Sequence, residues 1–453
     1  MKPITFALPE FNSASREEIR RAQESLLPGQ MKYCYENSIF YKKKFDEIGV
    51  RPEDIRTLDD LLRLPVLMIK DDERQSQKES MEQYGHPFGI HLCAPVKDVF
   101  LTGTTSGTTG IPTFTYTFTK ADLDLLAVPL GHRFAVCGVK PGDRMLFCFA
   151  LGVYATSMTL WGIRHIGALP IDVDARAGTH MILQFAELAS PSWLACTPSL
   201  AEHLAEKAPA IIGKDMFKLG LKGLFLTGET WATIPEVKQR IEEKYGCRAY
   251  DFWTPAGHAS AISCDSNDYY GLHGIGPHLC TSFEDLIDPI TRKSIDIVDG
   301  AIGEMVQTSL QRKACPFVKY AYGDIVQIFT KECPGCGFKG SRVKVIGRAD
   351  DMLIVKGVNV YPAAIREVVN KFAPDVTGEI RIILDSPPPR VVPPLKLKIE
   401  HGKSISPEGL SLLGAKIKGA QHNTIKINPV IEFVPPGSFE KSTRKTSIFE
   451  KRY

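Results

Sequence analysis

Short apolar runs alternate with helical segments between residues 97 and 253, and this alternation constrains the fold more than any other feature of the chain. The segment 143–152 (DRMLFCFALG) is typical of a buried strand, and 156–167 (TSMTLWGIRHIG) has the apolar spacing of a helix. In 192–208 (SWLACTPSLAEHLAEKA) a strand is followed by a helix that starts at Thr197-Pro198. Strands that alternate with helices of this length predict βαβ units and a largely parallel sheet.

The two ends of the chain have other patterns. Residues 15–49 carry apolar residues at helical spacing, with a break expected at Pro28-Gly29. After residue 290 the pattern favours strands, and a final unit mixes strands with helices expected over 362–372 and 407–420.

We therefore predict an α/β fold in two unequal domains, because 453 residues exceed the size of one ordinary core. The large N-terminal domain, residues 1–348, would contain the βαβ units and mixed sheets. A small α+β domain would span residues 349–453, with the segment around Asp350 as the candidate hinge.

Composition and charge favour a cytoplasmic globular protein. Hydrophobic residues at 43% and charged residues at 24% are the balance of globular enzymes, not of disordered or fibrous proteins. The net charge of +3 gives no electrostatic reason to expect nucleic acid or a membrane as partner. We expect neither a membrane span nor a signal peptide, and the eleven cysteines as thiols or metal ligands. A homodimer is compatible with the sequence.

The stretch Thr102–Pro112 has the composition of an anion-binding loop. It combines three glycines with six hydroxyl side chains. Glycines let the backbone turn its N–H groups toward an anion, and hydroxyls add donors without bulk. No lysine follows Gly110, so the loop is not that of P-loop nucleotide hydrolases. An ordinary flexible turn is the alternative.

This stretch resembles the SSGTTGKPT loop of adenylate-forming enzymes in the phenylacetate–CoA ligase branch. Further motifs follow in the order of that family: LACTPSLAEHLAE, FLTGETW, YDFWTPAG, SCDSNDYYGLH, FVKYAYGDIV and GRADDMLIVKGVNVYPAAIREVV. The resemblance implies a large nucleotide-binding domain and a small mobile C-terminal lid that rotates between two half-reactions.

The resemblance also assigns roles to individual residues. Those implied to hold the ATP triphosphate are Ser106, Gly107, Thr108, Thr109 and Gly110. Those implied to line the adenine and acyl site are Gly228, Glu229, Tyr250, Asp251 and Trp253. Asp324 and Arg348 would hold the ribose hydroxyls, since a carboxylate accepts from paired hydroxyls. Taken alone, Asp324 could equally be a turn residue and Arg348 a surface cation.

The expected catalytic residue is Lys445, whose surroundings are similar to the family's G-x-x-P-R-S-x-G-K stretch. An ammonium there can neutralise charge that develops when a carboxylate attacks the α-phosphate, an effect of about 3–4 kcal/mol. A solvated basic tail is the alternative, and Lys441 is the weaker candidate. Lys356 and Gly357 resemble the segment that lines the pantetheine tunnel for coenzyme A, although Gly357 could simply end a strand.

Cys333 and Cys336 have the C-x2-C spacing of a zinc knuckle. A knuckle supplies two ligands, so a second pair is needed, and Cys264 and His273 are the best candidates because the family carries a similar Cys and GLH. Four protein ligands would make a structural Zn²⁺ site. The rival ligands are Cys280, Cys315 and His278, and free buried thiols are the alternative.

Two positions depart from the family pattern. The lysine after SGTTG is Ile111 here, and the expected carboxylate facing Mg²⁺ is Gly257. The alternatives for holding Mg²⁺ are Glu229, a shifted ligand or the phosphates alone, since Mg²⁺ needs only one or two protein carboxylates. In the acyl pocket, bulky residues at Tyr154, Ala155 and Trp161 suggest a small acid, aromatic with one ring or short and branched or hydroxylated. Packing against a neighbouring helix would explain the same residues.

These features predict an AMP-forming carboxylic acid–CoA ligase that uses ATP, Mg²⁺ and coenzyme A. The alternatives are an adenylating enzyme that loads a carrier protein and a nucleotide-binding homologue with impaired catalysis.

Overall fold

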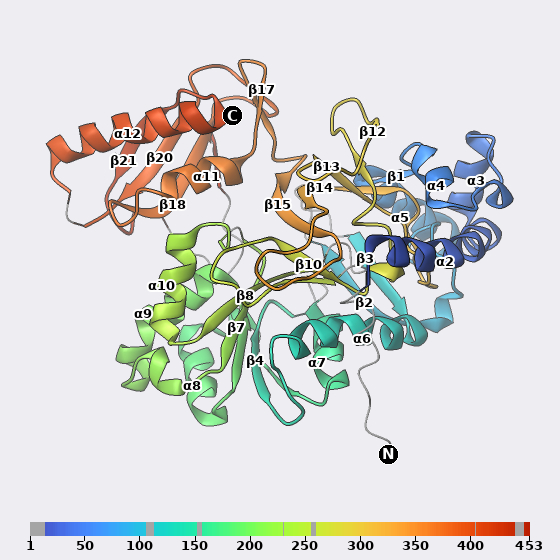
Figure 1. The fold of residues 1–453 in the computed structure, drawn as a ribbon, viewed down its shortest axis with the longest axis horizontal. Helices are drawn as coiled ribbons and strands as arrows, with labels where there is room; N and C mark the ends of the chain where they lie inside the picture. The colour runs from blue at the N-terminus through green and yellow to red at the C-terminus, as the bar shows by residue number, and fades with distance from the viewer. Residues whose placement is uncertain are drawn as a thin grey trace.

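A mixed sheet dominates the fold of this protein, whose structure is a computed structural model (Figure 1). The structure describes residues 14–105, 113–151, 156–229, 231–254, 260–403, 405–439 and 448–453. The strands of the sheet are β1 (Met68–Ile69), β4 (Arg144–Cys148), β5 (Leu169–Asp172), β6 (Trp193–Cys196), β7 (Gly223–Leu226), β8 (Arg248–Trp253), β9 (Ser260–Ser263), β10 (Leu272–Ile275), β11 (Leu286–Ile287), β12 (Ser294–Ile295), β13 (Ile302–Gln307), β14 (Tyr320–Phe329) and β15 (Arg342–Arg348). Within the described ranges they run in the order β12-β11-β13-β14-β15-β10-β9-β8-β7-β6-β4-β5, and β1 pairs with β14.

The half of the sheet from β5 to β8 is parallel, as the strand–helix alternation predicts. Its helices are α6 (Lys120–Ala135), α7 (Thr156–His165), α8 (Thr179–Ala189), α9 (Pro198–Ile212) and α10 (Pro235–Tyr245). Along β4, Met145 and Phe147 pack in one core cluster with residues of α6 and α7, while Leu146 and Cys148 pack in another with α8, α9 and α10. Both faces of the parallel half are therefore covered, which explains why its strands are almost continuously apolar.

From β8 onward the sheet is antiparallel. Strand β8 pairs in parallel with β7 on one side and antiparallel with β9 on the other. The α/β class with βαβ units and mixed sheets, predicted from the sequence, is confirmed. Local signals are also confirmed: α9 begins with Pro198 in its first turn, and the Thr197 side chain accepts a hydrogen bond from the Leu200 amide.

The N-terminal segment forms α2 (Arg16–Asn37), α3 (Ile39–Glu47), α4 (Leu58–Arg63) and α5 (Lys70–Tyr84). The break expected at Pro28 is wrong, because α2 continues through this proline. Proline inside a helix costs about 3 kcal/mol. Burial of the neighbouring Leu27, Met31 and Cys34 in the core offsets that cost, so tertiary packing overrides the local signal.

A two-stranded hairpin, β2 (Val99–Thr105) and β3 (Thr113–Thr119), lies next to the main sheet. The register pairs Thr105 with Thr113, so the strands bring together the two ends of the predicted phosphate loop. Its core, residues 106–112, lies outside the described residues.

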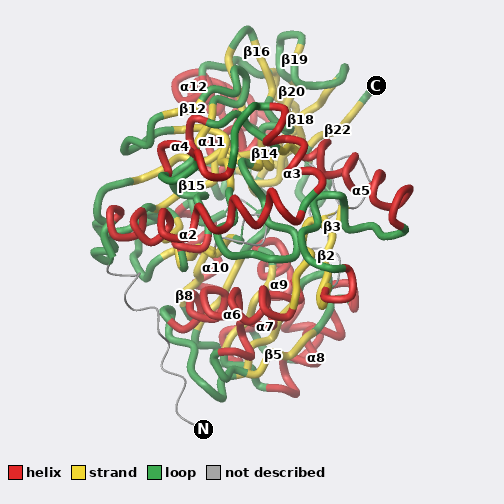
Figure 2. Tube along the Cα trace, turned by 90° about the vertical axis from the view of Figure 1, so that its right-hand side faces the viewer, coloured by secondary structure: helices red, strands yellow, loops and turns green. Residues whose placement is uncertain are grey.

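A smaller α+β body follows β15, and both views place it at one end of the molecule (Figures 1 and 2). It contains β16 (Leu353–Val355), β17 (Val358–Val360), β18 (Val376–Leu384), β19 (Arg390–Val391), β20 (Lys396–His401), β21 (Val430–Val434) and β22 (Phe449–Lys451), with helices α11 (Pro362–Asn370) and α12 (Pro407–Ile425). Its strands form two separate sheets, β17-β16-β19 and β21-β20-β18-β22, around a core of its own. The helices expected over 362–372 and 407–420 are both present.

All eleven cysteines lie in the described part of the chain and are free. Among the helices that the structure describes, none combines the length and the apolar character needed to cross a bilayer.

Candidate functional site

A buried carboxylate anchors the base of the predicted phosphate loop. Glu73 of α5 accepts hydrogen bonds from Lys70 Nζ at 3.0 Å, from Tyr320 Oη at 2.7 Å and from the hydroxyl of Thr115 on β3. Burial disfavours the charged carboxylate, but Lys70 and the hydroxyl donors outweigh it and lower the pKa of Glu73. Helix α5 and β14 therefore hold β3 in place three residues after the loop, at Thr115.

The Gly228–Glu229 turn follows β7 directly. Gly228 has φ +93°, a conformation that glycine adopts without strain. Glu229 Oε2 accepts from the Ser199 amide at 3.0 Å and Oε1 from the Ser199 hydroxyl at 2.5 Å. The Glu229 carboxylate is thus bound at the start of α9, where an anion complements the helix dipole. No described residue is therefore assigned to Mg²⁺, and Gly257 lies outside the described residues.

Asp251, near the end of β8, is half-buried and has two hydrogen-bond donors. Trp231 Nε1 donates to Oδ1 at 3.2 Å, and Tyr269 Oη donates to Oδ2 at 3.0 Å. Desolvation nevertheless raises the pKa of Asp251 to about 7, against the lowering effect of both donors. A carboxyl group that titrates near neutral pH in a partly open position is a signature of a functional site.

Tyr250 does not lie on the same face of β8 as Asp251 and Trp253, because successive strand residues point to opposite faces. Its ring stacks on Phe225 at a centroid distance of 5.6 Å, and its hydroxyl lies 3.2 Å from Asp265 Oδ1. The structure therefore brings Asp251 and Trp253 to one side of the sheet and Tyr250 into the core on the other.

Asp324 and Arg348 form an ion pair across β14 and β15. They are register partners, and Arg348 Nη1 lies 2.7 Å from Asp324 Oδ1. Arg348 Nη2 also donates to the Tyr322 carbonyl at 3.0 Å, and Nε lies 2.8 Å from Asp350 Oδ1. Gly323 between them has φ +96°, and a Cβ there would lie 2.9 Å from Arg348 Nη2. Only glycine fits this close approach, and the arginine links the predicted ribose residue to the predicted hinge residue.

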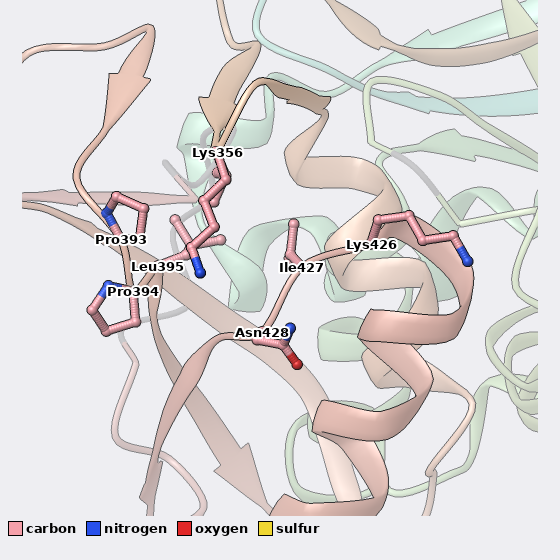
Figure 3. A pocket seen from close by; sticks show the side chains of 8 residues that line it. Lys356, Pro393, Pro394, Leu395, Lys426, Ile427 and Asn428 are labelled. Carbon is pink, nitrogen blue, oxygen red and sulfur yellow. The ribbon is translucent and has the colours of Figure 1, made fainter.

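Lys356 and Gly357 form the two-residue turn between β16 and β17. Both have left-handed φ, 51° and 79°, between the paired residues Val355 and Val358. Two such residues are typical of a type I′ hairpin turn, so Gly357 does more than end a strand. Lys356 also lines a pocket of about 220 Å³, shown in Figure 3, whose other walls include Pro393, Pro394 and Leu395.

Trp161 of α7 makes packing contacts. Its ring meets Phe100 of β2 edge-on at 5.9 Å, and Lys120 Nζ lies 5.4 Å above it. The other residues expected around the acyl group and the reacting centre, Tyr154, Ala155 and Lys445, lie outside the described residues, as does Lys441.

The four predicted zinc ligands lie together. The ligand atoms of Cys264, His273, Cys333 and Cys336 are all within 4.8 Å of one another. Tetrahedral Zn²⁺ with Zn–S bonds of about 2.3 Å requires sulfur atoms about 3.8 Å apart, so a small inward movement would complete the site. The rivals Cys280, Cys315 and His278 are not part of this cluster in the described ranges.

The orientation of His273 suits metal binding. Its Nδ1 lies 3.2 Å from the Ile262 carbonyl oxygen, which can only accept, so Nδ1 carries the proton. Its Nε2 lone pair then faces Cys336 Sγ at 3.3 Å. A bound ion would join β9 and β10 to the knuckle that precedes β15.

Sequence reasoning missed the groups that hold the predicted site residues. Trp231 and Tyr269, the donors to Asp251, lie inside the quoted motifs FLTGETW and SCDSNDYYGLH, and Ser199 lies inside LACTPSLAEHLAE. The motifs contained these residues, but only the fold shows which carboxylate each one contacts.

Comparisons with known proteins find similarity to CoA ligases in both sequence and structure. Residues 357–452 match the family model described as "AMP-binding enzyme C-terminal domain". A phenylacetate–coenzyme A ligase of Thermus thermophilus is 29% identical over 381 residues, which cover 83% of this chain and 80% of that protein.

A solved structure of 2-hydroxyisobutyryl-CoA ligase in the postadenylation state, in complex with R3-HIB-AMP, has a TM-score of 0.83 and 25% identity to this chain. The similarity covers 98% of this chain and 91% of the ligase chain. The same ligase in the thioesterification state, over 98% of this chain and 91% of that one at 26% identity, has a TM-score of 0.68.

We predict that the purified protein contains about one Zn²⁺ per chain, because the cluster offers four protein ligands and leaves no open position. Replacing both Cys333 and Cys336 with serine should remove the metal and lower the melting temperature. Elemental analysis checks the stoichiometry, with Cys137→Ser as the control that keeps it. Protein that is produced with zinc in the medium but contains no bound zinc would contradict the prediction.

A second prediction concerns pH. The folded pKa of Asp251, about 7, lies above the ordinary value of 3.8, so the stability from the neutral carboxyl is full below about pH 3.8 and lost as pH rises through about 7. One pKa unit is about 1.4 kcal/mol, and allowing for partial exposure we expect a loss of about 2 kcal/mol between pH 5 and 8.

Asp251→Asn should remove that loss, because an amide does not ionise. Denaturant unfolding of both proteins at the two pH values measures it. Asp268→Asn, at an exposed position nearby, should keep the wild-type dependence. Equal pH dependence in the wild type and Asp251→Asn would contradict the assignment.

Proposed function

We infer that this chain, an acid–thiol ligase of the phenylacetate–CoA ligase-like branch of adenylate-forming enzymes, joins a small carboxylic acid to coenzyme A through an acyl-adenylate. The similarity along nearly the whole chain to a CoA ligase solved with an acyl-AMP supports this most strongly. The similarity includes the C-terminal body, which matches an AMP-binding enzyme family by itself.

The proposed reaction has two steps. In the first, a carboxylate oxygen of the acid attacks the α-phosphorus of ATP, an acyl-AMP forms and pyrophosphate leaves. In the second, the thiol of coenzyme A loses its proton and attacks the acyl carbon, a thioester forms and AMP leaves. We assign the ATP triphosphate to residues 106–110, the ribose to Asp324 and Arg348, and the charge that develops at the α-phosphate to Lys445.

The contacts of Arg348 suggest how the nucleotide site and the hinge communicate. Its guanidinium is shared between Asp324 of the large body and Asp350 at the start of the C-terminal segment. Ribose hydroxyls that bind Asp324 would compete with Arg348 for the same carboxylate. We propose that Asp350 is the hinge, with the domain boundary between residues 348 and 349.

The comparison with one ligase in two states supports a rotating C-terminal lid. Both comparisons cover 98% of this chain, yet the TM-score falls from 0.83 to 0.68 between the two states. The arrangement of the two bodies here is thus nearer to the postadenylation state. In this arrangement Lys344 of β15 and Glu367 of α11 form an ion pair at 3.4 Å, a contact that rotation would break.

The test is a screen of small carboxylic acids with ATP and free coenzyme A. We expect AMP and pyrophosphate in equal amounts, and an acyl-CoA by mass spectrometry, with one class of small acid. Pyrophosphate exchange without thioester formation on free coenzyme A would favour a carrier protein as acceptor. No exchange and no ATP binding, measured by calorimetry with and without Mg²⁺, would overturn the proposal.

Lys445→Ala should reduce acid-dependent ATP–pyrophosphate exchange by about 100- to 1,000-fold, because it removes the cation proposed to stabilise the first transition state. Thioester formation from a supplied acyl-adenylate should remain near the wild-type rate. Lys441→Ala in the same basic segment is the matched control and should retain exchange. Unchanged exchange in Lys445→Ala would remove this lysine from the mechanism.

A further inference from the structure

Arg133 of α6 is a completely buried cation, with an exposed fraction of 0%. Its guanidinium lies against the rings of Phe134 and Phe252, at 4.7 Å and 4.6 Å from their centroids. Nη1 donates to the hydroxyl of Thr254, Nη2 donates to the hydroxyl of Thr159 at 3.1 Å, and Nε has no partner among the described residues. Aromatic faces and neutral hydroxyls stabilise the charge but do not neutralise it.

Among the other buried cations in the described part of the chain, Lys319 and Arg312 have anionic neighbours, whereas Arg342 donates to the carbonyl oxygens of Tyr270 and Lys331. Lys319, 0% exposed, lies 2.9 Å from the buried carboxylate of Asp285. Arg312 donates to two backbone carbonyls and is stabilised by the nearby Asp122. Burial lowers the pKa of Arg133 to about 9, and no carboxylate among the described residues acts against it. Since unpaired buried charges are costly, an unpaired arginine at this depth indicates a site.

Arg133 lies on the α7 side of the sheet, opposite to the side that carries Asp251 and Trp253. Thr254 directly follows β8, three residues after Asp251, and is half-buried rather than fully buried. Thr159 lies on α7, whose first residue, Thr156, follows the segment assigned to the acyl pocket. Because the Thr254 oxygen accepts from Arg133, its O–H hydrogen is free to donate to another acceptor.

A second polar group lies on the same side of the sheet without a partner. Ser260 on β9 is 0% exposed, and its hydroxyl oxygen has no hydrogen-bond partner among the described residues. The register pairs Trp253 with Ala261, so the next position places Ser260 opposite Thr254. Arg133, Thr254 and Ser260 together offer several donors and no anion.

We propose that these residues form a subsite for a second carboxylate of the acyl substrate, so that this ligase activates short dicarboxylic acids. This inference rests on the proposed function. One carboxylate of the substrate would react with ATP, and the other would stay ionised beside Arg133 through both steps. A permanent anion is the natural counterpart of a guanidinium, which forms charge-assisted hydrogen bonds with carboxylates. The second carboxylate would also accept a hydrogen bond from Arg133 Nε, which has no partner among the described residues.

The test compares malonate, succinate and glutarate with their monomethyl esters in ATP–pyrophosphate exchange. For the preferred chain length we expect kcat/KM about 100-fold or more higher for the diacid, because a site built for a polar group strongly rejects the analogue that lacks it. Arg133→Met should remove this preference while exchange with the monoester persists. Arg144→Met, which changes an arginine on the surface, is the matched control.

Three outcomes would overturn the subsite. One is a wild-type preference for the monoesters or for acids without a second carboxylate, which would leave the proposed function intact. Another is an Arg133→Met variant that loses exchange with all acids equally, since the arginine would then serve the reacting carboxylate. The third is a large fall in melting temperature for Arg133→Met, which would make the arginine structural; removal of an unpaired buried charge should preserve or raise it.

A binding measurement separates this inference from the proposed function. The preferred diacid alone, without ATP, should raise the melting temperature of the wild type and not that of Arg133→Met. If no acid supported exchange, the three diacids would be measured in turn. A rise in melting temperature for the wild type alone would still support the subsite, and no rise with any diacid would overturn it.

Discussion

The change from parallel to antiparallel strand pairing at β8 organises the functional part of this protein. On one side β8 continues the parallel βαβ half, and on the other it begins the antiparallel half. Parallel strands deliver the ends of β7 and β8 to one edge, with Asp251 near the end of β8 and Gly228 and Thr254 just beyond the two strands. The antiparallel strands return Ser260 and Tyr269 to the same region.

Around this junction the cost of burying charge decides which groups can act. Lys319 and Asp285 satisfy one another and leave nothing for a ligand. Asp251 has only neutral donors, so desolvation moves its pKa to about 7. Arg133 has only hydroxyl and aromatic neighbours in the described chain. Neither group has an oppositely charged partner among the described residues, and both lie near the end of β8, where a substrate could supply one.

The C-terminal body is joined to the large body through β15 and the residues that follow it. The Arg348 guanidinium contacts one carboxylate on each side of the junction between the bodies, Asp324 and Asp350. Because the donors of an arginine form a rigid fork, Arg348 can contact both carboxylates at once. A ligand that binds one carboxylate would weaken the contact between Arg348 and that carboxylate. The cluster of Cys264, His273, Cys333 and Cys336 lies at the other end of β15, before Arg342. A metal there would join the loops beside β9, β10 and β15.

The sequence by itself determined the strand–helix alternation of the βαβ half and the starts of α9 and α12, because these depend on local periodicity and on residues that favour the first turn. Spacing and resemblance together also selected Cys264, His273, Cys333 and Cys336, which the fold brings together. The sequence did not determine that α2 continues through Pro28, where burial of Leu27 and Met31 outweighs the local cost. Only the tertiary structure decided that Tyr250 turns away from Asp251 and that Arg133 is buried without an anion among the described residues. Contacts between separate elements, such as Arg133 with Thr254 and Tyr250 with Phe225, determine this burial, and no local pattern encodes them.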